Sequence, residues 1–212
     1  MISDNIGNQI LHFAFEGIPP HGIKIVTIAA NLMLSDKANP IQIDNKQAYI
    51  EPQKYIEADH AEIIKLAADL NASTPMKTAQ KTFQWVSKNT NYAGYIKNDR
   101  GALYALRQKK GDCTEFMYLF VALCRANRIP ARPIGGYICR SNCILKPSGY
   151  HNWAEFYEAG SWKTVDPQKR VFMENPSDYI AMRVIGDTAG NPMGDHHRFR
   201  FRGEGMAVRM NR

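Results

Sequence analysis

Apolar positions in the middle of the chain repeat at helical spacing. Within residues 57–70, Ile63, Ala67 and Leu70 fall on one face of a helix. The segment 73–89 shows the same period behind a Ser-Thr-Pro start, which is typical of a capped first turn. Residues 101–111 predict a shorter helix that ends at Gly111. We expect the apolar stripes of these helices to face a core.

The longest helix is predicted from the run "DCTEFMYLFVALCRANRIPAR", residues 112–132. Asp112 or Thr114 can cap its start, and Pro130 marks its end. Its apolar residues form one wide stripe at helical spacing: Phe116, Leu119, Phe120, Leu123 and Cys124. We expect this helix to lie at the centre of the fold.

Beyond this helix the pattern changes to short β-type runs. "ARPIGGYIC", "HNWAEFYE" and "SWKTVDP" predict three strands, and "AGS" at 159–161 predicts a tight hairpin link between the last two. Residues 1–56 also read as strands, around the turn cluster "EGIPPHG". We therefore predict an α+β fold with an N-terminal β-rich appendage (1–56), a core (57–185) and a basic C-terminal tail (186–212) that packs on or extends the core.

Composition narrows the class of protein. The chain has 212 residues, of which 44% are apolar and 22% charged, as expected for a soluble globular domain. No apolar run approaches the roughly 20 residues that span a bilayer, and "MISDNIGNQI" does not resemble a signal peptide. We therefore expect a cytoplasmic protein without membrane contact. The net charge of +7 is spread along the chain outside any nucleic-acid motif, so no nucleic-acid partner is predicted, and the oligomeric state stays open.

Four cysteines are too few for a disulfide framework in a chain of this length. Cys124 falls in the apolar helix and is interpreted as a core residue. Cys139 and Cys143 lie four residues apart in a loop, where they could pair, bind a metal or do neither. Together with His151 they make a zinc site conceivable, but zinc sites usually have a fourth ligand at close spacing. We therefore predict neither a metal nor a cofactor.

Cys113 stands where a helix begins, directly after Gly-Asp. The unpaired N–H groups and the positive dipole end of a helix start favour a thiolate, which is the reactive form of cysteine. His151 opens one predicted strand and Asp166 closes the next, so an antiparallel hairpin brings both to its open end. A carboxylate that orients an imidazole beside a thiol is the arrangement of a catalytic triad. Each residue also has a structural explanation, as a buried thiol, an edge-strand histidine or a strand-end cap.

The same stretches, 109–137 and 150–168, resemble the transglutaminase-like superfamily, which has a papain-like cysteine catalytic core. The pattern is carried by a Gly-x-Cys helix start, an Ile-Pro-Ala-Arg helix exit, a Gly-Tyr strand, a His-x-Trp-x-Glu strand and a Trp-x-x-Val-Asp-Pro strand. The resemblance covers residues 75–170, and the segment "YIAMRVIGD" (179–187) is similar to the segment after the core in bacterial members.

The resemblance implies roles for these residues. Cys113 would be the nucleophile, His151 the base and acid, and Asp166 the residue that orients the imidazole. An acyl thioester would form from an amide. The oxyanion would bind the backbone N–H of Cys113 and a side-chain donor, for which Tyr92 is the candidate. Trp153 would wall the site or pack beneath it.

The resemblance predicts a transglutaminase-like cysteine protease or amidase that hydrolyses protein or peptide substrates. Acyl transfer to a lysine amine, which crosslinks proteins, is the alternative within the same chemistry. Hydrolysis is favoured because the chain shows neither an EF-hand calcium loop nor the extra domains of animal crosslinking enzymes. Two further hypotheses stay open: a non-catalytic protein-binding module of the same fold, and a metalloprotein using Cys139, Cys143 and His151.

Overall fold

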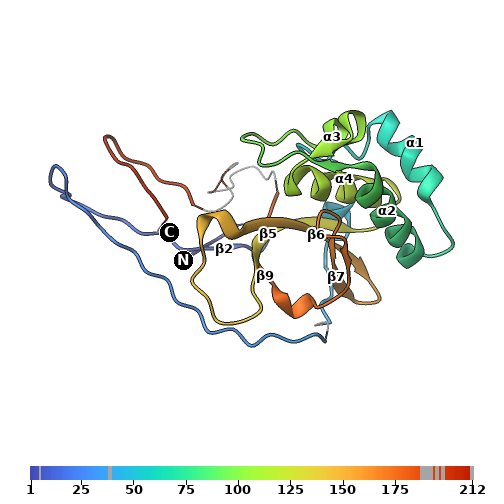
Figure 1. Cartoon of the computed structure of the whole chain (residues 1–212). Coiled ribbons are helices and arrows are strands. Elements are labelled where there is room, and N and C mark those ends of the chain that lie inside the picture. Colours follow the sequence, from blue (N-terminus) through green and yellow to red (C-terminus); the bar gives the residue numbers. More distant parts are fainter. Residues whose placement is uncertain (5, 38–39, 187–192, 194–195, 197–198, 211–212) are drawn as a thin grey trace.

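The computed structural model describes residues 1–4, 6–37, 40–186, 193, 196 and 199–210. Within them, helices gather on one side of an antiparallel sheet (Figure 1). The fold is therefore α+β, as predicted. The helices are α1 (Ala61–Leu70), α2 (Pro75–Asn89), α3 (Ala102–Gln108) and α4 (Cys113–Ala126). Three short 3-10 helices are η1 (Gln47–Tyr49), η2 (Pro147–Gly149) and η3 (Pro176–Asp178).

Local signals explain where the helices begin. The Thr74 side chain accepts a hydrogen bond from the backbone N–H of Lys77 and caps α2, and Pro75 occupies the first turn, as predicted. The prediction that Gly111 ends the third helix was wrong. Helix α3 ends earlier, where Lys109 takes the left-handed conformation at φ 53°. Residues 110 and 111 are instead extended, because they form a strand that pairs with residues 91 and 92.

Five strands form the main sheet, in the order β8-β7-β6-β5-β9. They are β5 (Ala131–Ile138), β6 (Tyr150–Glu158), β7 (Ser161–Asp166), β8 (Val171–Phe172) and β9 (Tyr179–Val184). All neighbours are antiparallel. Ala159 and Gly160 both have positive φ, at 49° and 78°, which is the backbone of a two-residue hairpin turn. The predicted hairpin between β6 and β7 is confirmed.

Helix α4 lies between the other helices and the sheet, in contact with α1, α2, α3, β5 and β6 (Figure 1). The sequence predicted one apolar stripe, but every residue from Thr114 to Arg125 is buried. In a helix that is packed on all sides, each polar side chain needs a hydrogen-bond partner inside the protein. Arg125 illustrates this, because its guanidinium donates to the carbonyl oxygens of Ala131 (3.0 Å) and Glu51 (2.6 Å).

The N-terminal part contains less strand than the sequence predicted. Strands β1 (Ile2–Ser3) and β2 (Gln9–Ile10) pair with each other, and the described residues of 11–46 carry no further strand. In Figure 1 this arm loops out from the sheet and returns to it, where the Ile41 backbone N–H donates to the carbonyl of Gly160 at 3.0 Å and its carbonyl accepts from the Tyr157 hydroxyl at 2.7 Å. Its β-type residues, Phe13, Ile23 and Ile25 among them, are exposed. Residues of high strand propensity form a strand only where the backbone can pair with a neighbouring strand, which explains the difference. The division of the chain at residue 56 stays a prediction.

The segment predicted as a basic tail lies partly outside the described residues. Of the part that is described, the carbonyl of His196 accepts a hydrogen bond from Arg183 of β9, and the Tyr137 hydroxyl of β5 donates to Met210 Sδ at 3.8 Å. Two tail residues therefore contact the sheet. Within the described ranges no helix is both long and apolar enough to cross a membrane.

Candidate active site

The start of α4 is built by a reciprocal capping box. The Asp112 side chain accepts from the backbone N–H of Thr114 (2.8 Å), and Glu115 accepts from the N–H of Asp112 (3.0 Å). Gly111 lets the incoming chain pass close to this turn, since a Cβ there would lie 2.3 Å from the Cβ of Glu115. Cys113, the first helical residue, is a free, partly exposed cysteine.

Glu115 also ties the preceding loop to this helix start. Its second carboxylate oxygen accepts from the backbone N–H of Arg100 at 2.9 Å, and the Asp112 carboxylate accepts from the N–H of Ile96 at 2.9 Å. Glu115 is completely buried, and burial raises the pKa of its carboxyl to about 7 against these hydrogen bonds, which lower it. The loop on one side of Cys113 is therefore held by two buried carboxyl groups.

His151 and Asp166 meet at the open end of the β6–β7 hairpin. His151 Nε2 lies 2.6 Å from Asp166 Oδ2, and Asp166 is fully buried. The other Asp166 oxygen, Oδ1, accepts from the backbone N–H of Lys169 at 3.0 Å, which fixes the carboxylate. The aspartate therefore orients the imidazole through one ring nitrogen and leaves the other, Nδ1, available.

Cys113 interacts with the same imidazole. Burial lowers the pKa of His151, but the hydrogen bonds and charges of Asp166 and Cys113 outweigh it and raise the pKa to about 9. The imidazole is therefore protonated at neutral pH. Because Nε2 faces Asp166, the nitrogen left for the thiol is Nδ1. The three predicted side chains thus come together from α4, β6 and β7.

A buried hydrogen bond holds helix α4 against β6 beside these residues. Asn152 Nδ2 donates to Thr114 Oγ1 at 2.9 Å, and both side chains are buried. Each of them directly follows a member of this cluster in the chain: Asn152 follows His151, and Thr114 follows Cys113. The bond therefore sets the distance between helix start and strand. It was not predicted, because no local pattern in the sequence marks such a contact.

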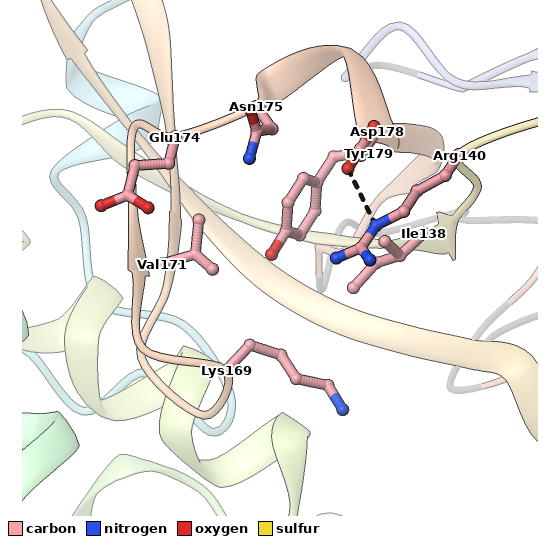
Figure 2. Close-up of a pocket in the computed structure, with 8 residues that line it drawn as sticks. All are labelled: Ile138, Arg140, Lys169, Val171, Glu174, Asn175, Asp178 and Tyr179. Atoms are coloured by element: carbon pink, nitrogen blue, oxygen red, sulfur yellow. Dashed lines mark hydrogen bonds and ion pairs between the residues drawn. The ribbon is translucent and has the colours of Figure 1, made fainter.

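Tyr179, at the start of β9, was not predicted as a site residue either. Its hydroxyl donates to Asp166 Oδ2 at 3.1 Å, so this carboxylate oxygen serves both Tyr179 and His151. Burial and the Asp166 charge raise the pKa of Tyr179, so it is a neutral donor. The ring also forms part of the wall of a pocket of about 370 Å³ (Figure 2). That pocket is lined by Ile138, Arg140, Lys169, Val171, Glu174, Asn175, Asp178 and Tyr179.

Trp153 packs beneath the imidazole. It is fully buried, its ring stacks on His151 at 6.5 Å between centroids, and it meets Tyr179 edge-on at 5.2 Å. Gly136 admits this packing, because a Cβ there would lie 2.7 Å from the Trp153 ring and 2.1 Å from the carbonyl oxygen of Ile180. Nearby on the strand pair, Glu155 binds Arg132 at 2.7 Å.

Tyr92, the candidate oxyanion donor, lies in strand β3 (Asn91–Tyr92), which pairs in parallel with β4 (Lys110–Gly111). Tyr92 is the register partner of Gly111, two residues before Cys113, and its side chain is largely exposed. In the described part of the chain no acceptor contacts the backbone N–H of Cys113, as expected at the first position of a helix. The role of Tyr92 stays a prediction.

The other cysteines are separate from this cluster. Cys124 is fully buried in α4, and burial raises the pKa of its thiol. Cys139 and Cys143 are both free, and their sulfur atoms lie 3.3 Å apart. Among the residues that the structure describes, no group of three or more His, Cys, Asp or Glu side chains could hold a metal ion. The two thiols and His151 therefore do not form a zinc site.

Comparison with known proteins shows which family and which folds this chain is similar to. Residues 64–167 match the family model of the transglutaminase-like superfamily. An uncharacterized protein of Haemophilus influenzae is 27% identical over 186 residues, covering 71% of this chain and 50% of that protein.

Two solved structures are similar. One, a "Putative Cysteine Protease" from Cytophaga hutchinsonii, has a TM-score of 0.56 and 24% identity, and covers 68% of this chain and 47% of that one. The periplasmic domain of TgpA from Pseudomonas aeruginosa is 21% identical with a TM-score of 0.42, and covers 52% of this chain and 43% of that one. The chain spans about half the length of these relatives. Residues 64–167 are therefore similar to the core of the transglutaminase-like superfamily, and the chain shares the fold of the Cytophaga hutchinsonii structure.

Proposed function

We propose that the protein is a cysteine-dependent acyl-transfer enzyme that acts on peptide or amide bonds, with Cys113, His151 and Asp166 as its triad. The observation that carries the proposal is the buried 2.6 Å contact between His151 and Asp166, with the Cys113 thiol at the same imidazole. A purely structural histidine would not need both a buried carboxylate and a thiol at a helix start.

The chemistry follows from this arrangement. The Cys113 sulfur, its proton held by His151, attacks the carbonyl carbon of the amide. The negative charge that develops on the carbonyl oxygen is stabilised by the free backbone N–H of Cys113 and the positive end of α4. The His151 imidazolium then gives its proton to the leaving amine, and the C–N bond breaks. A thioester remains on Cys113.

Hydrolysis is the proposed fate of the thioester. Water loses a proton to His151 and adds to the carbonyl carbon, the C–S bond breaks, and the acid is released with the thiol restored. Cys113 is partly exposed, which supports access of water. An amine that enters in place of water would give a crosslinked product, and this remains the alternative proposal.

Thiol labelling tests the nucleophile. Iodoacetamide at about pH 6.5 is expected to modify Cys113 at least about tenfold faster than Cys143, because an ordinary thiol is almost fully protonated at that pH. Cys143 is the internal control, because it is exposed and its thiol contacts Cys139 rather than His151. Quantitative mass spectrometry of the two peptides gives the rates, with Cys113→Ala as the blank. Equal rates at the two cysteines would contradict the proposal.

A peptide-library profile separates hydrolysis from transfer. Incubation of the full chain with the library should produce cleaved peptides both with and without an added primary amine. Amine-bearing peptides that form in place of cleaved ones would favour the crosslinking alternative. Peptides that Cys113→Ala also converts are background. If neither product exceeds this background, the enzyme proposal fails and the protein-binding module gains support.

Tyr92→Phe tests the side-chain oxyanion donor. Removal of one such donor is expected to lower kcat about 100-fold with little change in KM, because the bond forms mainly in the transition state. Tyr95→Phe is the matched control, since Tyr95 is an exposed tyrosine three residues further along the chain. A loss of less than about threefold for Tyr92→Phe would assign the oxyanion to other donors.

A further inference from the structure

Two thiols outside the triad are in direct contact. Cys139 follows the end of β5 and Cys143 lies four residues on, in a loop without helix or strand. The Cys143 thiol donates to the sulfur of Cys139, with 3.3 Å between the sulfur atoms. Both are free, Cys139 is partly buried, and Cys143 is exposed to solvent. The acyl-transfer chemistry uses neither residue.

We propose that Cys139 and Cys143 form a redox modification site that accepts oxidising equivalents from a small-molecule disulfide such as oxidised glutathione. A protein disulfide needs the two sulfur atoms about 2.05 Å apart. Starting from a 3.3 Å contact within one loop, this needs only a small adjustment of the side chains or the loop. Residues 140–144 of the loop are exposed, so little packing opposes that adjustment.

The reaction balances as two thiol–disulfide exchanges. The exposed Cys143 thiolate attacks one sulfur of oxidised glutathione and releases one glutathione thiolate, leaving a mixed disulfide. Cys139 then attacks the Cys143 sulfur and releases the second glutathione. The protons of the two protein thiols go to the two glutathione molecules. The protein pair is oxidised, and the small disulfide is reduced.

The second exchange should set the rate. Burial raises the pKa of Cys139 to about 11, so little of its thiolate exists at neutral pH. Loop closure is therefore expected to become faster as the pH rises toward that value. The other two thiols differ in setting: Cys124 is buried inside α4, and Cys113 faces His151.

The disulfide would cross-link a segment that borders the pocket. The backbone N–H of Cys139 donates to the carbonyl of Asp178 at 2.8 Å, and Arg140 pairs with the Asp178 carboxylate at 3.3 Å. Arg140 and Asp178 both line the pocket (Figure 2). Oxidation therefore closes a five-residue loop directly beside it.

The experiment uses the full-length Cys113→Ala variant, which removes the competing reactive thiol. The protein is incubated with oxidised glutathione, denatured, alkylated with iodoacetamide and digested with trypsin. Trypsin cleaves after Arg140, between the two cysteines. The peptides that carry Cys139 and Cys143 should therefore appear as one linked species that separates on reduction, with Cys124 as the only alkylated cysteine. A non-reducing gel should show a monomer.

Two controls make the result decisive. Cys143→Ser should abolish the linked species and leave Cys139 alkylated, whereas Ser141→Ala, in the same loop, should not change it. If Cys143 stops at the glutathione adduct while Cys139 is alkylated at every ratio of oxidised to reduced glutathione, the proposal is overturned. A linked species found only in dimers would overturn it as well.

Discussion

Asp166→Asn is expected to lower kcat for peptide hydrolysis about 10³- to 10⁴-fold while the protein stays folded. The carboxylate accepts from three donors: His151, the Tyr179 hydroxyl and the backbone N–H of Lys169. An asparagine keeps the shape and one acceptor oxygen, but it places an amide donor against the imidazole or fails to hold it. The ring then loses both its orientation and the charge that stabilises its protonated form. Steady-state kinetics and circular dichroism provide the two measurements.

In Asp166→Asn, the alkaline limb of the pH profile of kcat/KM should move to lower pH. Asp166 and Cys113 raise the pKa of His151 to about 9 against burial, so kcat/KM is expected to fall as the pH rises through about 9, where the imidazolium loses its proton. With the carboxylate gone, burial lowers the His151 pKa, and the limb shifts toward lower pH. If Asp166 acted only by supporting the fold, the substitution would lower kcat/KM at every pH and leave the position of the alkaline limb unchanged.

Glu155→Gln is the matched control for this substitution. Glu155 is also a carboxylate on the sheet, four residues from His151 in β6, and it pairs with Arg132 at 2.7 Å. The change should leave kcat within about threefold and the limb unmoved, because the side chain does not contact the imidazole. If Glu155→Gln and Asp166→Asn lowered kcat equally, the loss of either carboxylate would disturb the sheet. The proposed role of Asp166 would then fail.

Glu115→Ala is expected to lower the free energy of unfolding by roughly 2 to 4 kcal/mol. The substitution leaves the backbone N–H groups of Asp112 and Arg100 without their acceptor and opens a cavity at a fully buried position. This is a large part of the stability of an ordinary domain. Urea unfolding followed by tryptophan fluorescence measures the change. Glu62→Ala, which removes an exposed acidic residue from the first turn of α1, should cost much less.

The pH dependence of the free energy of unfolding tests the titration of the Glu115 carboxyl group. Because burial raises the Glu115 pKa from 4.5 to about 7, the folded state holds a proton that the unfolded state has already lost. The resulting stability is complete below about pH 4.5 and is lost as the pH rises through about 7. Glu115→Gln does not titrate, so the advantage of the native protein over this variant should shrink across that range. A constant difference would contradict the raised pKa.

Several features were available from the sequence because they depend on neighbours along the chain. The D-x-x-E pattern in "DCTE" is a capping box, and it placed a thiol at the first turn of α4. Asp112 was predicted as a cap, whereas Glu115 was not, although the spacing marks it. The strands that carry His151 and Asp166 are joined by a two-residue turn, so the antiparallel pairing of a hairpin predicts that both residues lie at its open end.

Other features have no local signal. The approach of Cys113 to His151 depends on how α4 docks on β6, which the buried Thr114–Asn152 bond fixes across 38 residues of sequence. Tyr179 reaches Asp166 only because β9 returns to the far edge of the sheet beside β5. In the same way, the β-type residues of the N-terminal arm predict strands that form only where a neighbouring edge is present, and the structure places two-residue strands there.

The amino-acid sequence by itself determined the starts of α2 and α4, the hairpin and the residue types of the site. These rest on hydrogen bonds and turns that span a few residues, whose energies do not depend on the rest of the chain. Only the tertiary structure decided which side chains share the Asp166 carboxylate, that α4 is buried on every side, and that Cys139 and Cys143 touch. Such contacts arise from packing between distant segments, where burial sets both the geometry and the protonation of the groups.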